Sequence, residues 1–414
     1  MCIRDSSSVL LTKQARKISE VLEIILGAAL SLEASDIHIE PQEKQIRLRL
    51  RLDGVLQDVL SFDRHTYQLL LSRIKLVSEL KLNVHDRAQD GRFTIRAQKM
   101  DIEVRTSILP GPYGESIVLR VLNPKTIALA FEDLGMHPYL QKMMIKEIKK
   151  PNGMILTTGP TGSGKTTTLY AFLKKIYSAE IKIITIEDPI EYHLKGISQT
   201  QVDPEKGYSF ANGLKAIVRQ DPDIIMVGEI RDLETAEIAI HAALTGHLVL
   251  STLHTNTAAG TIPRLLDLGI KPNVFAPAIN VAMAQRLVRK LCTKCKKQYT
   301  PNQKEQLKIK HLINNLPKGI KKPKLDKIKI WQANKCPECN NTGYKGRIGI
   351  FEAFNVNEKI ERLIFQYPSE TQIEKAALEA GMLTMQQDGI LKVLNGLTSL
   401  KELERVVGVI SAST

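Results

Sequence analysis

One run of eight residues sets the expected architecture of this chain: Gly159-Pro160-Thr161-Gly162-Ser163-Gly164-Lys165-Thr166. An apolar strand-like segment precedes it at residues 155–158, and an amphipathic helical segment follows from Thr167. In that context the pattern G-x-x-x-x-G-K-[ST] predicts a phosphate-binding loop, whose glycines let backbone N–H groups point at phosphate oxygens. We therefore expect residues 159–167 to bind ATP. Lys165 would neutralise the β and γ phosphates, and Thr166 would offer its hydroxyl to Mg²⁺.

The segments around this loop predict an α/β core. Short, nearly continuous apolar runs occur at residues 154–158, 181–186, 223–227 and 248–253. Helical patterns at residues 167–179 and 234–245 alternate with them. Strands that are apolar along their whole length are typical of a parallel sheet covered by helices on both faces. We expect this core to span residues 134–291.

Acidic and imidazole side chains stand at the ends of the expected strands. Glu187 follows one strand and Glu229 follows another, at the edge where open α/β sheets bind ligands. One carboxylate would hold Mg²⁺ through water and the other would orient the attacking water; the alternative is an exposed strand-end charge. Gly228 stands where an aspartate is usual, so metal binding is either looser or relies on Glu229. His254 is a candidate sensor of the γ-phosphate, with a purely structural histidine as the alternative.

The first third of the chain predicts a separate α+β domain, residues 1–122. A helical pattern at residues 18–32 precedes a strictly alternating strand at 45–52, and Asp53-Gly54 supplies a hairpin turn to a partner strand at 55–60. Further strands are expected at residues 92–95, 101–108 and 116–122, before a linker at 123–133. The last part, residues 351–414, predicts helices that stop at Gly381 and Gly396.

Composition and charge restrict the class of protein. At 414 residues, 43% hydrophobic and 25% charged, the chain is typical of a soluble globular protein with two or three domains. The longest apolar run, residues 24–30, is too short to span a bilayer, and the first residues lack a secretory signal, so we expect a cytoplasmic protein. Residues 296–335 contain twelve lysines against Glu305 and Asp326, and so carry +10 of the net charge of +14. Because few aromatic residues accompany these lysines, nucleic acid is not the expected partner.

Four of the five cysteines form two C-x-x-C pairs, Cys292 with Cys295 and Cys336 with Cys339. In a cytoplasmic chain two such pairs predict a structural Zn²⁺ bound by four thiolates, with no open position for catalysis. The forty residues between the pairs exceed the usual spacing, and buried thiols without metal are the alternative. We expect a zinc module at residues 292–350 that carries the lysine-rich stretch as a loop. A contact of that loop with an anionic membrane face or an acidic protein surface is our hypothesis.

Several further motifs occur in the order of one known family. They are Glu187-Asp188-Pro189-Ile190-Glu191, Gly228-Glu229-Ile230-Arg231-Asp232, and Thr245-Gly246-His247 with His254-Thr255-Asn256. Outside the core stand Ala34-Ser35-Asp36-Ile37-His38-Ile39-Glu40, Gln89-Asp90-Gly91-Arg92, Gln285-Arg286-Leu287 and Gln387-Asp388-Gly389. With the phosphate loop, these residues resemble the type II secretion and type IV pilus assembly ATPases over about residues 15 to 410.

The resemblance implies a RecA-like motor domain behind a smaller PAS-like domain, assembled as a hexameric ring that binds ATP between subunits. It also implies arginines donated across the subunit interface to the γ-phosphate, which by motif position are Arg105, Arg120, Arg219 and Arg231. A solvated sheet face is the alternative for the first two. Lys215 and Thr257 stand where the family commonly has Arg and Asp, and the retraction motors of the family lack the four-cysteine module.

The resemblance further implies a motor at the inner face of the cytoplasmic membrane. Its partners would be an inner-membrane platform protein and a cytoplasmic docking protein, and through them pilins or pseudopilins. Alternatives are a nucleic-acid translocase, which DNA would stimulate, a DNA-uptake pseudopilus motor, and a nucleotide-gated scaffold without turnover. The family's N-terminal docking domain is expected to be missing here, and residues 1–8, which match nothing in the family, are expected to be non-native.

Overall fold

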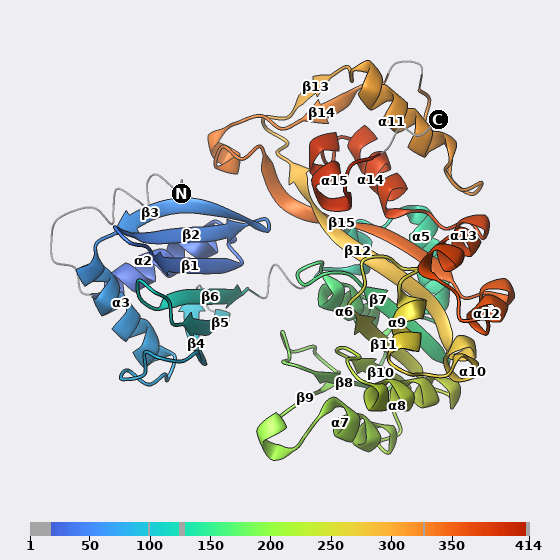
Figure 1. Cartoon of the computed structure of the whole chain (residues 1–414), viewed down its shortest axis with the longest axis horizontal. Helices are drawn as coiled ribbons and strands as arrows, with labels where there is room; N and C mark the ends of the chain where they lie inside the picture. Colours follow the sequence, from blue (N-terminus) through green and yellow to red (C-terminus); the bar gives the residue numbers. More distant parts are fainter. Residues whose placement is uncertain (1–17, 98–99, 124–128, 326–327, 411–414) are drawn as a thin grey trace. The chain divides into compact units, whose positions relative to one another are not determined.

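Two sheets organise the chain, one in each of two units. The computed structural model describes residues 18–97, 100–123, 129–325 and 328–410. One unit comprises Met1–Ile127 with Lys335–Asn341, and the other comprises Ala128–Asn334 with Thr342–Thr414. The expected non-native residues 1–8, and residues 124–128 of the expected linker, lie outside the described residues. Figure 1 shows the elements of both units.

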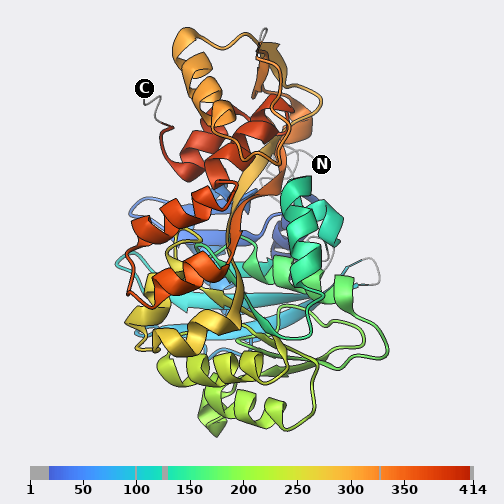
Figure 2. The same cartoon turned by 90° about the vertical axis from the view of Figure 1, so that its right-hand side faces the viewer.

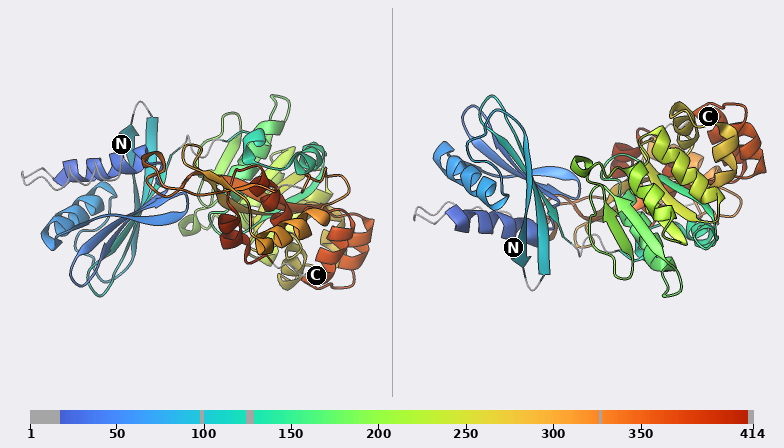
Figure 3. Two further views of the ribbon diagram at one scale, coloured as in Figure 1. Left: turned by 90° about the horizontal axis from the view of Figure 1, so that it is seen from above. Right: turned by 90° about the horizontal axis from the view of Figure 1, so that it is seen from below.

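The first unit contains a six-stranded antiparallel sheet in the order β3-β2-β1-β6-β5-β4. Two helices, α2 and α3, pack together on one face of this sheet (Figure 3). The elements are α2 (Ile18–Ser31), β1 (Asp36–Pro41), β2 (Ile46–Leu52), β3 (Val55–Phe62), α3 (Arg64–Val77), β4 (Gln89–Ala97), β5 (Met100–Leu109) and β6 (Ser116–Leu122). The predicted strands and the first helix are confirmed, whereas α3 and β1 were not predicted.

Local sequence explains the hairpin in this sheet. Along β2 burial alternates residue by residue, with the aliphatic side chains buried and the arginines partly exposed. Asp53 and Gly54 have φ angles of 49° and 81°, which is the left-handed conformation that a two-residue hairpin turn requires. The unpredicted helix α3 begins after Asp63, whose carboxylate accepts a hydrogen bond from the Thr66 backbone N–H and so caps the helix.

The second unit contains a seven-stranded sheet in the order β15-β12-β7-β11-β10-β8-β9. All neighbours are parallel except β12 and β15, which are antiparallel. The strands are β7 (Gly153–Thr158), β8 (Ile183–Glu187), β9 (Ser198–Gln201), β10 (Ile224–Val227), β11 (Leu248–Leu253), β12 (Ile279–Leu291) and β15 (Tyr344–Asn355). The strands β7, β8, β10 and β11 are buried at every residue and pair with one another in parallel. The predicted parallel sheet is therefore confirmed.

Helices cover this sheet. Two of them, α6 and α8, confirm the helices expected at residues 167–179 and 234–245, with ends that differ by one to three residues. The helices around the sheet are α5 (Pro138–Glu147), α6 (Lys165–Ile176), α7 (Phe210–Val218), α8 (Leu233–Leu244), α9 (Thr261–Asp267) and α10 (Pro272–Phe275). Short 3₁₀ turns occur at η1 (Phe131–Leu134), η2 (Pro204–Lys206), η3 (Ala276–Ala278) and η4 (Pro337–Cys339). Within the described residues, no helix combines the length and the apolar character that crossing a membrane requires.

A long antiparallel ribbon, β12 with β15, was not predicted. It runs out of the sheet towards a small subdomain made of β13 (Lys297–Tyr299), α11 (Gln303–Asn314) and β14 (Ile330–Gln332), as Figures 1 and 2 show. Four helices follow: α12 (Glu358–Ile364), α13 (Glu370–Glu379), α14 (Met385–Leu394) and α15 (Leu400–Val407). Gly381 and Gly396 have φ angles of 92° and 64° after α13 and α14, which confirms them as helix stops. The strand β15 runs across the boundary expected between residues 350 and 351.

A buried carboxylate joins α15 to the ribbon. Glu402 is 1% exposed, and it accepts hydrogen bonds from the guanidinium groups of Arg289 on β12 and Arg405 on α15. Burial alone would raise the pKa of Glu402, but the hydrogen bonds and charges of Arg405 and Arg289 outweigh it and lower the pKa to about 2. Because this value lies below that of an unfolded glutamate, the ionised carboxylate stabilises the folded state.

We expect Glu402→Gln to destabilise the chain at neutral pH by about 3 kcal/mol, because it leaves two cations without their counter-charge. The carboxylate's stabilisation is fully present above about pH 5 and is lost as pH falls towards 2, through the folded-state pKa. The difference in unfolding free energy between wild type and variant, measured in urea at pH 7 and at about pH 3.5, should therefore shrink at the lower pH. An unchanged difference would contradict this assignment.

Candidate nucleotide-binding site

The predicted phosphate loop lies between β7 and α6, as its sequence context requires. Gly159, Gly162 and Gly164 all have positive φ angles, of 144°, 78° and 89°. This backbone conformation is accessible to glycine at little cost, and Gly164 caps the N-terminus of α6. The loop therefore presents its backbone at a helix N-terminus, which is an arrangement that binds anions.

The ammonium group of Lys165 lies over the loop. It donates hydrogen bonds to the carbonyl oxygens of Gly159 at 2.8 Å and Pro160 at 3.3 Å. Burial lowers the pKa of Lys165, and the negative charge of Glu229 partly opposes that effect. Lys165, the first residue of α6, and Glu229, two residues after β10, thus interact electrostatically.

Glu229 follows β10 and contacts two of the predicted site residues. Its carboxylate accepts a hydrogen bond from Arg231 at 2.5 Å and lies 3.1 Å from Nε2 of His254, which follows β11. Burial would raise the pKa of Glu229, but Arg231 and His254 lower it below its usual value. An added Cβ at Gly228 would lie 3.3 Å from the Cα atom of Glu187, so a larger residue there would require a small shift of β8.

Glu187 ends β8 and is 2% exposed. Its two carboxylate oxygens are occupied by three side chains: Tyr170 of α6 donates to Oε2, while Thr185 and Gln199 donate to Oε1 at 2.5 Å and 3.0 Å. Burial, together with the neighbouring Glu187 charge, raises the pKa of Tyr170 well above its usual value. Glu187 is thus part of a buried hydrogen-bonded cluster that links β8, β9 and the phosphate-loop helix.

Two of the predicted arginines lie in the first unit and are neighbours on adjacent strands. Arg105 of β5 stands directly opposite Arg120 of β6, and Arg92 of β4 stands opposite Arg105 on the other side. Arg120 donates to Asp36 at 3.1 Å and remains 56% exposed. Arg105 in turn donates to Glu103 at 3.1 Å, so the carboxylates of Asp36 and Glu103 offset part of the repulsion between these neighbouring arginines.

The other two predicted arginines lie in the second unit. Arg219 is exposed at the C-terminus of α7. Arg231 is engaged within its own chain, because it pairs with Glu229 and lies 3.6 Å from Asp188. His247 stands at the opposite end of β11 from His254, and its Nδ1 contacts the carbonyl oxygen of Ala242 at 3.0 Å. His247 therefore contributes to a helix end and not to the loop site.

The four cysteines of the two C-x-x-C pairs come together. Their sulfur atoms all lie within 4.8 Å of one another, and Cys336 and Cys339 are 3.5 Å apart. A tetrahedral Zn²⁺ with bonds of about 2.3 Å would require sulfur atoms about 3.8 Å apart. Four thiolates at this spacing fit a structural zinc ion and offer no open coordination position.

Comparison with known proteins decides the family. The family model described as "Type II/IV secretion system protein" matches residues 12–405. The Type II secretion system ATPase E of Vibrio cholerae is 45% identical over 389 residues, which cover 94% of this chain and 75% of that protein. The chain belongs to the type II/IV secretion system ATPase family. It is accordingly an ATP-hydrolysing enzyme that uses ATP and Mg²⁺.

Solved structures agree with the fold of this secretion ATPase. The pilus retraction motor PilT, solved with bound ADP, is 27% identical, has a TM-score of 0.60, and matches 95% of this chain and 97% of its own. The ATPase DotB of Legionella pneumophila has a TM-score of 0.67 at 20% identity, with 95% of this chain and 96% of that chain covered. The latter likeness supports the α/β ATPase fold alone.

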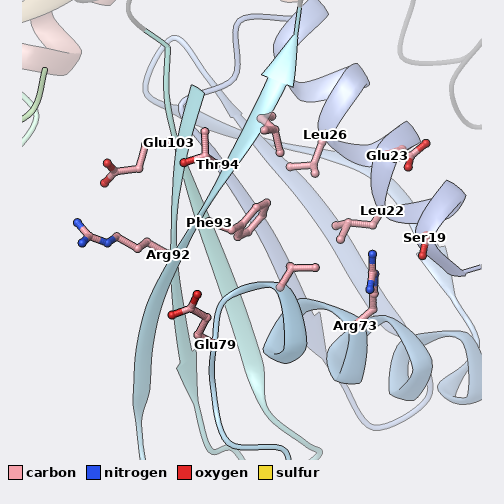
Figure 4. A pocket seen from close by; sticks show the side chains of 12 residues that line it. Ser19, Leu22, Glu23, Leu26, Arg73, Glu79, Arg92, Phe93, Thr94 and Glu103 are labelled. Atoms are coloured by element: carbon pink, nitrogen blue, oxygen red, sulfur yellow. The ribbon is translucent and has the colours of Figure 1, made fainter. Parts of the chain in front are cut away.

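A separate cavity of about 770 Å³ lies in the first unit of the secretion ATPase, between the two helices and β4 (Figure 4). In Figure 4 Phe93 points towards the helices, whereas Arg92 and Glu103 point away from them. The lining includes three carboxylates, of Glu23, Glu79 and Glu103, and two guanidinium groups, of Arg73 and Arg92. These charges nearly balance, so the cavity does not indicate one class of ligand.

Sequence reasoning missed three residues that the structure places in or beside the predicted site. Tyr170 and Gln199 hold Glu187, and Gln285 of β12 contacts the phosphate loop. For the first two, the sequence offered no local signal, because their partner is distant along the chain. Gln285 stood within a motif of the secretion ATPase family, but its neighbours gave no indication of what it contacts.

Proposed function

We propose that this chain is the ATP-hydrolysing subunit of a hexameric motor that drives type II protein secretion or type IV pilus assembly. The observation that carries the proposal is the juxtaposition of the Lys165 loop with Glu229 at the C-terminal edge of a parallel sheet. Membership of the secretion ATPase family supports the mechanical role. In this proposal, hydrolysis moves the two units against each other.

Each residue of the loop site has a proposed role. The backbone of residues 159–167 cradles the phosphates, and Lys165 offsets the charge that develops on the β and γ phosphates. Glu229 orients the attacking water and accepts its proton, and His254, which contacts its carboxylate, senses the loss of the γ-phosphate. The hydroxyl of Thr166 and a carboxylate are oxygen ligands of the kind that Mg²⁺ prefers, and that ion would neutralise charge between the phosphates.

Glu187 has a proposed role as the second acid of the site. Its carboxylate is held by Tyr170, which lies on the helix that the phosphate loop begins. A movement of this helix would therefore alter the hydrogen bonds of Glu187 directly. We assign to Glu187 the coupling of the nucleotide state to β8 and β9. Its motif also implies that its carboxylate would hold Mg²⁺ through a water molecule.

The arginines are proposed to complete the site between subunits. Arg105 and Arg120 of one subunit, with Arg219 and Arg231, would stabilise the transferring phosphoryl group. The placement of Arg105 and Arg120 side by side on β5 and β6 supports this role, because it brings two guanidinium groups together on one sheet face. The six-stranded first unit would be the PAS-like domain that presents this face to the neighbouring subunit.

This arrangement predicts complementation between two inactive variants. Lys165→Ala removes the cradle, and Arg120→Ala removes the donated cation and should lower ATP turnover by roughly a thousandfold. When equal amounts of the two variants assemble at random, about a quarter of the subunit interfaces combine an intact phosphate loop with an intact arginine from the neighbour. Phosphate release by the mixture should therefore recover to about a quarter of the wild-type rate.

The control for this experiment is Arg96→Ala, which removes an arginine of β4 that is 82% exposed and pairs only with Asp101 among the described residues. It should turn over ATP as wild type does, alone or mixed. If the Lys165→Ala and Arg120→Ala mixture stayed inactive while both variants assembled, the arginine would act within its own chain. That result would refute the shared site.

The remaining proposals concern location and partners. We assign the motor to the cytoplasmic side of the inner membrane, where it would engage a platform protein and a cytoplasmic docking protein and, through them, pilins or pseudopilins. The four-cysteine cluster would hold structural Zn²⁺. Exposed lysines of the loop after α11, including Lys318, Lys321 and Lys324, would face an anionic surface.

A further inference from the structure

Gln285 connects the ribbon β12–β15 to the phosphate loop. It lies near the middle of β12 and is 2% exposed. Its side-chain Nε2 donates to the carbonyl oxygen of Ser163 at 2.7 Å, and its Oε1 accepts from the Thr168 hydroxyl at 2.8 Å. A single amide therefore holds both the loop and the first turn of α6.

The loop is also packed closely against Gln285. A Cβ atom at Gly159 would lie 2.4 Å from the backbone oxygen of Gln285, and one at Gly164 would lie 2.8 Å from its Nε2. A Cβ atom is not tolerated 2.4 Å from a backbone oxygen, so glycine at position 159 permits the close approach of β12, whereas at Gly164 the Gln285 side chain would have to shift. A displacement of β12 at this point would move the loop.

The same strand leads directly to the four cysteines. β12 pairs with β15 from Gln285 opposite Phe351 to Arg289 opposite Arg347, and after a register shift Leu291 pairs with Tyr344. The next residue is Cys292, whose backbone N–H donates to the carbonyl oxygen of Gly343 at 3.0 Å. At about 3.3 Å per residue, this extended stretch separates Gln285 from the cysteine cluster by roughly 23 Å.

The C-terminal helix α15 braces the strand between these two points. Glu402 accepts hydrogen bonds from both the backbone N–H and the guanidinium of Arg289, at 3.1 Å and 2.7 Å. Arg286, next to Gln285, donates to the carbonyl oxygen of Val406 at 2.8 Å. The guanidinium of Arg289 also lies 4.2 Å from the ring centre of Tyr344 on β15. The strand is thus held by its partner β15 and by α15 between Gln285 and the cysteines.

We propose that Gln285 is a positioning residue for the phosphate loop, and that β12 transmits to it the metal state of the four-cysteine cluster. The proposal rests on the proposed function in that it takes the loop to bind ATP. Metal bound by the cysteines holds the far end of the ribbon in register. Gln285 then holds the loop in the conformation that accepts the phosphates, which lowers the cost of ATP binding.

The test measures the dissociation constant of a fluorescent ATP analogue with the full chain, either loaded with Zn²⁺ or stripped by a chelator. Gln285→Leu keeps the size of the side chain but removes both hydrogen bonds. It should weaken nucleotide binding by about tenfold in the zinc-loaded chain, because two buried polar partners lose their bonds. Removal of zinc should weaken binding of the analogue to wild type severalfold. In Gln285→Leu it should weaken binding of the analogue little further.

Two further variants sharpen this test. Gln298→Leu, at an exposed glutamine of β13, is the matched control and should respond to zinc removal as wild type does. Gln285→Glu keeps the acceptor for Thr168 but loses the donor to Ser163. If Gln285→Leu folds poorly, Gln285→Glu replaces it in the test. Gln285→Glu should bind the ATP analogue more weakly than wild type, and its affinity should no longer depend on zinc. In steady-state kinetics, either variant should raise KM more than it lowers kcat.

Wild-type affinity in both Gln285 variants would overturn the positioning role. Equal effects of zinc removal in wild type and Gln285→Leu would overturn the transmission along β12. Neither result would affect the proposed function, provided that Lys165→Ala still loses nucleotide binding. If Lys165→Ala bound the analogue and hydrolysed ATP as wild type does, the proposed function itself would fail, independently of Gln285.

Discussion

Replacement of Lys165 by alanine is expected to lower ATP turnover by more than about a hundredfold, the loss seen when a single preorganised charge or donor is removed from a reacting anion. The ammonium group lies over the loop, held by the carbonyl oxygens of Gly159 and Pro160. It is therefore positioned at the loop backbone that would surround the phosphates. Alanine removes this charge where burial makes it most effective, since few water molecules can replace it.

Steady-state phosphate release measures this effect, and titration with a fluorescent ATP analogue separates lost binding from lost chemistry. The matched control is Lys174→Ala, which removes an exposed lysine from the same helix, α6. It should leave both measurements near the wild-type values. Turnover at the wild-type rate in Lys165→Ala would remove the phosphate loop from the proposed mechanism.

Glu229→Gln is expected to bind ATP but to hydrolyse it at least a hundredfold more slowly, which is the usual range for loss of a general base. Glutamine has nearly the same shape, so it can still contact Arg231 and His254, as Glu229 does at 2.5 Å and 3.1 Å. It cannot accept a proton from water at neutral pH. The loss should therefore appear in kcat, with the affinity for the nucleotide largely retained.

The control for this prediction is Glu234→Gln, in the first turn of α8, where the side chain is 60% exposed and pairs with Lys215. This variant should hydrolyse ATP normally. A single-turnover experiment would show directly whether Glu229→Gln stops at the chemical step with ATP bound. A fall in affinity that matched the fall in rate would assign Glu229 to binding and not to water activation.

Much of the second unit could be predicted because its signals are local. The loop Gly159 to Thr166 identifies itself by residue type and spacing, and it lies between the strand and helix that were expected. Buried parallel strands such as β11 are apolar throughout, so their bounds follow from hydropathy alone. The two cysteine pairs likewise predict a common metal site, and the structure brings their sulfur atoms together.

Other features escaped prediction because they depend on partners far along the chain. The strand β12 mixes apolar residues with Gln285, Arg286 and Arg289, and it therefore lacks the period of either a helix or a half-buried strand. Its polar side chains are satisfied by residues of the phosphate loop and of α15. Helix α3 was also missed, although its start carries a local signal, the capping carboxylate of Asp63.

The sequence alone determined that this chain has an ATP-binding loop on a parallel sheet, acids at the strand ends, and a four-cysteine cluster. Each of these follows from the chemistry of a few residues close together along the chain. Only the tertiary structure decided that Glu187 is enclosed by Tyr170 and Gln199, that Glu229 faces His254, and that one amide of β12 holds the loop. Hydrogen bonds between distant segments depend on how the strands pack side by side, and no local pattern encodes that arrangement.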